Sequence, residues 1–155
     1  MGVRLMMLCL ALASGTSVFG GEPTPTGDLA KLQGVWETKA GPLKDQPLRM
    51  TIKGTDLTLR YTIPGRKEPM VLEGRVALDE SSSPRGMDWL DMHIGKQELP
   101  AVYSIYELKD DSLRVRGSGA KVRPTEFQDD DDVPRHRSLQ FRRVRDGDST
   151  EKTAS

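Results

Sequence analysis

Hydrophobic and polar residues alternate along the middle of the chain in short runs, which are bounded by glycine, proline or aspartate. Alternation with a period of two gives a β-strand one apolar and one polar face. The clearest run covers residues 70–78, where Met70, Leu72, Val76 and Leu78 share one face. The pattern predicts eight strands, over residues 36–38, 48–52, 57–63, 70–78, 87–94, 102–108, 113–115 and 139–144.

The run over residues 87–94 does not follow a single alternation. Met87 and Trp89 favour one face of the strand, whereas Leu90, Met92 and Ile94 favour the other. A β-bulge, in which one strand carries an extra residue, would reconcile the two halves. The register of this strand therefore stays open at the level of sequence.

The predicted strands follow one another through short turns, as in an antiparallel meander, and no long helix is expected. Eight strands of this kind remove their exposed edges when the sheet closes on itself. Asp28 is a candidate N-cap for a short helical turn over residues 29–32, just before the first strand. The expected fold is an all-β, antiparallel, eight-stranded barrel, with this turn at one mouth.

The first twenty residues have the pattern of a secretory signal peptide. Arg4 supplies the positive charge, residues 5–13 are apolar, and Val18 and Gly20 suit the positions before a cleavage site. The apolar run is about half of the roughly 20 residues that a membrane span needs. We therefore expect export to the periplasm or the medium, with no stable membrane insertion after cleavage. The predicted organisation is a leader (1–20), a linker (21–27), one domain (28–145) and a polar tail (146–155).

Composition narrows the possible functions. The only cysteine, Cys9, lies in the leader, so the exported chain has no thiol for a disulfide, a nucleophile or a metal site. The chain has 23 basic and 23 acidic residues and a net charge of zero. Without an overall positive field, we expect no binding to nucleic acid.

Trp36 and Arg143 are the predicted pair that closes the barrel. Trp36 opens the first strand, and Arg143 shares a face of the last strand with Leu139 and Phe141. A guanidinium over an indole ring contributes about 0.5–2 kcal/mol, depending on how far it is removed from water. We expect this pair to be structural rather than a ligand site.

Several segments resemble a family of small secreted lipocalin-like domains of unknown function that is found in planctomycete bacteria. The resemblance runs from about Asp28 to Arg145. It rests on four segments, Leu32-Gln33-Gly34-Val35-Trp36, Pro84-Arg85-Gly86-Met87-Asp88, Tyr106-Glu107-Leu108-Lys109-Asp110-Asp111-Ser112-Leu113 and Arg123-Pro124-Thr125-Glu126-Phe127. The family usually has Gly before Asp where this chain has Lys109-Asp110-Asp111. The resemblance implies a lipocalin-like barrel and export, and it implies no activity.

An eight-stranded barrel is either filled by its own side chains or holds one small ligand. The leading hypothesis is non-catalytic binding of a small apolar molecule inside the barrel, where Gly74 would leave room. The candidate lining residues are Leu59, Tyr61, Leu72, Gly74 and Tyr106. The alternative is an interaction or structural module of the cell envelope with a filled barrel. A protein partner is not indicated by the sequence.

Residues outside the strands provide few candidate sites. Phe127 is predicted to cover a barrel mouth, with Arg123 and Glu126 paired at its rim. Asp129 to Asp132 lack the ligand spacing of a calcium loop, and the two histidines, His93 and His136, are too few for a zinc site. The arginines near the C-terminus could bind anions, but the acidic run just before them competes. We expect no enzyme, no cofactor and no metal.

Overall fold

The computed structural model describes residues 24–40, 46–118, 122–128 and 138–145. The predicted leader and tail lie outside these ranges. The described elements are α1 (Gly27–Leu32), β1 (Gly34–Ala40), β2 (Gln46–Lys53), β3 (Asp56–Tyr61), β4 (Met70–Asp79), β5 (Arg85–Ile94), β6 (Gln97–Glu98), β7 (Val102–Lys109), β8 (Ser112–Gly117) and β9 (Leu139–Arg143). The eight predicted strands are present, with ends that differ by one or two residues, and the two-residue β6 is an addition.

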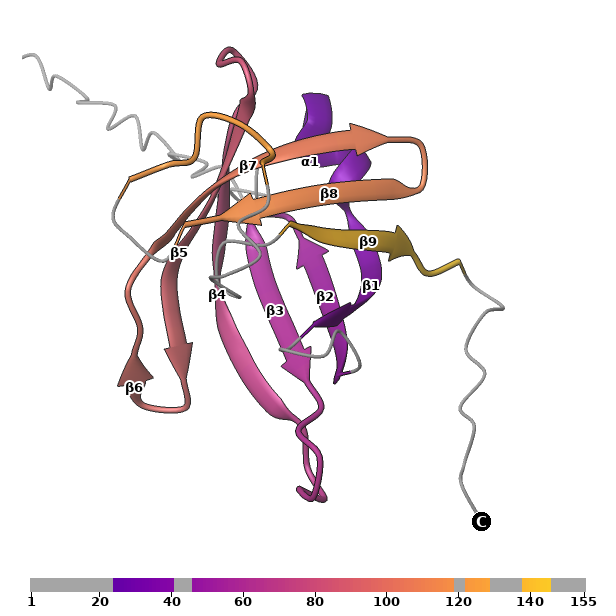
Figure 1. Cartoon of the computed structure of the whole chain (residues 1–155), viewed down its shortest axis with the longest axis vertical. Helices are drawn as coiled ribbons and strands as arrows, with labels where there is room; N and C mark the ends of the chain where they lie inside the picture. The colour runs from indigo at the N-terminus through magenta and orange to yellow at the C-terminus, as the bar shows by residue number, and fades with distance from the viewer. Residues whose placement is uncertain (1–23, 41–45, 119–121, 129–137, 146–155) are drawn as a thin grey trace, which may run out of the picture.

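The strands form one closed antiparallel barrel (Figure 1). Each strand pairs with its neighbour in the chain, except that β7 pairs with β5 and the short β6 lies at the side of β5. The last strand, β9, pairs with the first, β1, through Trp36 opposite Arg143 and Glu37 opposite Arg142. This pairing closes the sheet, so the predicted eight-stranded barrel is confirmed.

A bulge between β4 and β5 resolves the irregular pattern of residues 87–94. Arg75 pairs with Leu90, but Glu73 pairs with His93, so two residues of β5 lie opposite Gly74. One of these is Asp91, which has a positive φ of 50°. The bulge shifts the inward and outward alternation of side chains along β5. As a result, Met87 on one side of the bulge and Met92 on the other both face the core.

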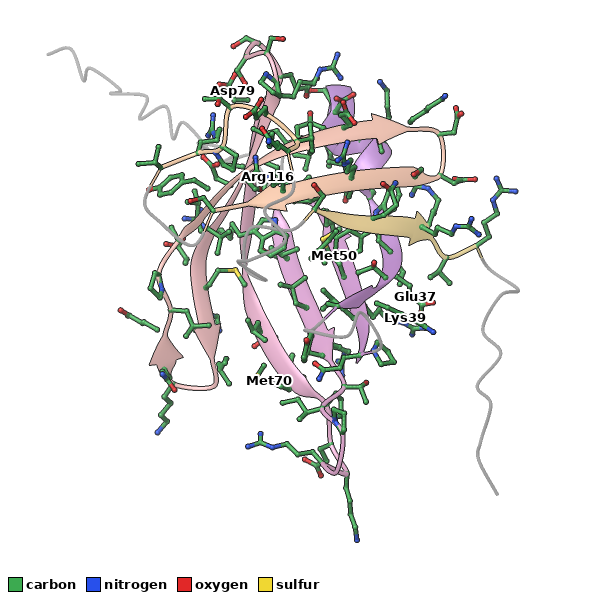
Figure 2. The ribbon with its side chains drawn as sticks, in the orientation of Figure 1. Glu37, Lys39, Met50, Met70, Asp79 and Arg116 are labelled. Atoms are coloured by element: carbon green, nitrogen blue, oxygen red, sulfur yellow. The ribbon has the colours of Figure 1, made fainter. Side chains whose placement is uncertain are left out.

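Inward-facing side chains from all eight strands form a single core cluster. Trp36, Met50, Leu57, Leu113 and Phe141 are completely buried. Figure 2 shows Met50 within the barrel, whereas Glu37 and Lys39 project from its outer side. The core therefore lies inside the barrel.

The helical turn α1 lies at one end of the barrel (Figure 1), but its N-cap is not Asp28. Thr26 occupies the cap position and makes no side-chain cap. The Asp28 backbone N–H instead donates to the Glu80 carboxylate at 3.0 Å, so a residue beyond β4 caps the helix. Asp28 follows the cap and is 2% exposed, and the predicted role of this residue was wrong. None of the helices in the described ranges is long and apolar enough to cross a bilayer.

Candidate functional site

The residues predicted to line a ligand cavity lie in or against the packed core. Leu59 and Tyr106 are 5% and 1% exposed, and Tyr61 and Leu72 are partly buried against the same cluster. The space beside Gly74 is occupied, because a Cβ there would lie 2.4 Å from Met92 Sδ and 2.7 Å from the Leu90 carbonyl oxygen. The expectation that Gly74 leaves room for a ligand was wrong. The glycine is needed because Met92, shifted inward by the bulge, fills that space.

The hydroxyl of Tyr106 is also engaged within the protein. It donates a hydrogen bond to Asp28 Oδ2 at 2.9 Å, and Lys31 Nζ lies 2.9 Å from Asp28 Oδ1. Arg85 forms an ion pair with the same carboxylate. Burial raises the pKa of Asp28, but the hydrogen bonds from Lys31 and Tyr106 and the charge of Arg85 outweigh it, so its pKa lies below the usual value. This network attaches α1 to β5 and β7, and it engages the hydroxyl proton of Tyr106 within the protein.

Asp28→Asn should lower the stability of the protein by about 1–2 kcal/mol at neutral pH, because hydrogen bonds to a charged partner are lost. The folded-state pKa of Asp28 is below its unfolded value, so its stabilisation is present above about pH 4 and is lost as the pH falls through the folded-state value. Urea unfolding at about pH 7 and pH 2 should show a difference between the two proteins only at the higher pH. An equal difference at both values would mean that the carboxylate charge does not matter.

The predicted contact between Arg143 and Trp36 is present. The guanidinium carbon of Arg143 lies 4.2 Å from the centroid of the Trp36 ring. The indole N–H donates to the carbonyl of Leu32, the last residue of α1, at 2.9 Å. Arg143 also donates to the Gln33 carbonyl at 2.7 Å and to Asp111 at 3.1 Å. The pair thus joins β9, β1, α1 and the turn between β7 and β8.

The Leu32-Gln33-Gly34-Val35-Trp36 segment has a structural explanation. The side chain of Gln33 accepts a hydrogen bond from the Gly54 N–H at 2.6 Å and donates to the Gly54 carbonyl at 3.0 Å. Gly34 has a φ of +110°, which other residues rarely adopt. These contacts attach the end of α1 to the turn between β2 and β3. The residues of this motif therefore have structural roles in the fold, and no ligand is needed to explain them.

Arg123 does not pair with Glu126 as predicted. It forms ion pairs with Asp88 at 2.6 Å and Asp79 at 3.5 Å, and its guanidinium lies across Gly86. A Cβ at Gly86 would be 2.5 Å from Arg123 Nη1. Two segments of the family resemblance, residues 84–88 and 123–127, therefore meet on the outside of the barrel. Neither segment reveals this contact alone, because the partners are 35 residues apart.

Phe127 also lies in a different place from the one predicted. The guanidinium of Arg114 stacks over its ring at 4.6 Å and donates to its carbonyl oxygen at 3.0 Å. Arg114 lies between the buried Leu113 and Val115 on β8, so its side chain is on the outer face. Phe127 therefore packs against the outside of the barrel and does not cover a mouth. The predicted rim site is a loop packed against β5 and β8.

A groove of about 660 Å³ lies on the outer face of β9, β1, β2 and β3. Its charged lining residues are Glu37, Lys39, Arg49, Arg60 and Arg142. The sequence does not reveal this site, because its members come from four strands. The one sequence feature related to this site is the basic run near the C-terminus. In the structure, neighbouring members of that run point to opposite faces of β9. Arg142 faces the groove, whereas the neighbouring Arg143 faces the core.

Metal ligands are not grouped in the described part of the chain. No set of three or more His, Cys, Asp or Glu side chains there could hold an ion. His93 lies 3.6 Å from Glu73 in an exposed pair. Asp129 to Asp132 and His136 fall outside the described residues, so the predictions for them stay predictions.

Comparison with protein families, with curated proteins and with solved structures finds no match for this chain. The established likeness is therefore to a fold, the closed eight-stranded antiparallel barrel. That fold supports many functions, so the functional argument depends on the sites described above.

Proposed function

We propose that this protein is an exported, non-catalytic interaction module, in which the barrel interior is a structural core and binding occurs on the outer surface. One observation carries the proposal: Met92 occupies the space beside Gly74 that a bound ligand would need. The hydrogen bond from Tyr106 to Asp28 adds to it, since the proton of that hydroxyl is already engaged within the protein. We therefore favour the filled-barrel hypothesis over an apolar ligand.

Export and family membership belong to the same proposal. Both are supported by the leader pattern in residues 1–20 and by the resemblance to secreted planctomycete domains. The barrel architecture agrees with the fold that this resemblance implies. N-terminal sequencing of protein recovered from outside the cytoplasm should begin near Gly21, and a chain that begins at Met1 would contradict processing.

Titration with a fluorescent fatty acid tests whether the barrel is filled. We expect no saturable binding to the wild-type protein, because its inward residues form one packed cluster. The comparison uses Leu72→Trp, which adds bulk on the inner face of β4, and Val71→Trp, which adds it on the outer face of the same strand. Saturable binding that Leu72→Trp abolishes and Val71→Trp leaves intact would show a ligand inside the barrel, and the proposal would then be wrong.

A further inference from the structure

The outer groove contains a transverse row of charged side chains. Arg142 lies opposite Glu37 across β9 and β1, Glu37 opposite Arg49 across β1 and β2, and Arg49 opposite Arg60 across β2 and β3. Neighbouring strands are about 4.8 Å apart, so the row from Arg142 to Arg60 covers about 14 Å. A row of this kind presents its charges at regular intervals on a rigid surface.

A second row lies beside the first. It consists of the residues two positions further along each strand, which point to the same face. These are Gln140, Lys39, Pro47 and Thr62, and all of them line the same groove. Lys39 pairs in register with Pro47, and the Thr62 N–H donates to the Pro47 carbonyl at 3.0 Å. The second row adds one positive charge and several uncharged groups to the site.

The groove has an excess of positive charge. Four cationic side chains line it against a single carboxylate, Glu37, which accepts a hydrogen bond from Arg49 Nε at 2.7 Å. Among the described residues, Lys39, Arg60 and Arg142 are exposed and have no ion-pair partner. The whole chain has no net charge, so this excess is a local feature of one face. Such a surface attracts an anionic partner over about 8–10 Å.

The chemistry of the lining favours a carboxylate-bearing polypeptide. A guanidinium binds a carboxylate through two parallel hydrogen bonds. The described lining has no aromatic side chain on which the bases of a single-stranded nucleic acid could stack. Pro47 and Pro69, which are both exposed, instead provide apolar surface for neighbouring peptide side chains. Because β1 already pairs on both sides, recognition must use these side chains and not an added strand.

We propose that the groove of β9, β1, β2 and β3 binds an acidic polypeptide segment in an extended conformation. Alternate residues of an extended chain point to the same side and repeat at about 6.6–7 Å. Two repeats cover about 14 Å, so an extended segment with alternating acidic residues could bring carboxylates to Arg142 and Arg60, with Lys39 of the second row beside the carboxylate between them. The inference depends on the proposed function, since it names where and with what class of partner the module interacts.

Fluorescence anisotropy with a labelled octapeptide of alternating Glu and Thr tests this proposal at low ionic strength. Arg60→Gln and Arg142→Gln should each weaken binding up to about fivefold, and the double variant by about twentyfold. The matched control is Lys96→Gln with Lys109→Gln, which removes the same charge at exposed sites outside the groove and should leave affinity nearly unchanged. Glu37→Gln should tighten binding, because it removes the carboxylate that competes for Arg49.

The alternative outcomes are distinct. Absence of saturable binding, or equal weakening in the groove and control variants, would overturn the acidic-peptide site. Preference for a labelled polyglucuronate over the peptide would overturn the choice of a polypeptide partner. The fatty-acid titration separates the two proposals: binding inside the barrel would contradict the filled core, whereas failure of both ligands to bind would contradict only the groove.

Discussion

Trp36→Ala is expected to lower the free energy of unfolding by about 3–5 kcal/mol, the range for emptying a large aromatic site in a core. Trp36 is completely buried at the junction of α1, β1 and β9. Its removal leaves a cavity under the Arg143 guanidinium and leaves the Leu32 carbonyl without its indole donor. Chemical denaturation of the purified variants would measure the loss. The free energy of unfolding of Trp36→Phe should lie between those of the wild type and Trp36→Ala, since phenylalanine keeps most of the ring volume but loses the N–H.

A double-mutant cycle with Arg143→Ala tests the closure pair itself. Arg143 contacts the Trp36 ring, so the two substitutions should be coupled by about 0.5–2 kcal/mol. Arg142→Ala provides the control, because Arg142 lies on the outer face at the next position of β9. Coupling of Trp36 to Arg142 as large as to Arg143 would contradict a specific contact across the β9–β1 junction.

Gly74→Ala should destabilise the protein by about 1–3 kcal/mol, which is the usual cost of adding atoms to a filled core. A new Cβ would lie 2.4 Å from Met92 Sδ, which could move, and 2.7 Å from the Leu90 carbonyl oxygen, which belongs to the backbone. Thermal unfolding of Gly74→Ala would measure this loss of stability. The control is Glu73→Ala, a substitution at an exposed neighbouring position of β4. Glu73→Ala should remain within about 0.5 kcal/mol of the wild type.

Combining Gly74→Ala with Met92→Ala separates the two contacts. The second change removes the sulfur but not the Leu90 carbonyl, so only part of the penalty from Gly74→Ala should be relieved. A barrel with an open space at Gly74 would instead tolerate the added methyl group. A stability of Gly74→Ala equal to that of the wild type would therefore count against the packed interior.

The barrel could be predicted from sequence because its main determinants are local. Alternation over residues such as 70–78 assigns the inward face of each strand, and turn residues separate the strands. Closure through Trp36 and Arg143 followed from their positions on the first and last strands. Even the irregular strand over residues 87–94 showed its bulge as a change of face.

The parts that could not be predicted depend on contacts between distant segments. The filling of the Gly74 space requires the bulge to bring Met92 inward, and the position of the bulge is fixed only by the pairing of β4 with β5. Asp28 resembles an N-cap locally, but Arg85 and Tyr106 reach it from other strands. Arg123 likewise forms an ion pair with Asp88 of a distant strand and not with Glu126, which is close to it in sequence.

The outer groove was beyond sequence analysis for a related reason. Glu37, Arg49, Arg60 and Arg142 form a row only when the register of three strand pairs is known. A slip of one residue in any pair would move a side chain to the other face of its strand. Turn lengths limited these registers but did not determine them, so the charge excess could not be located.

We infer that side chains fill the barrel and that binding therefore depends on the outer surface. A crystal structure of the protein under xenon pressure tests it most directly, since xenon enters apolar cavities inside proteins. We expect no xenon between β4 and β5 beside Gly74 and Met92, and none among the buried side chains around Leu59. Xenon, or a co-purified molecule, bound among those side chains would contradict a filled barrel.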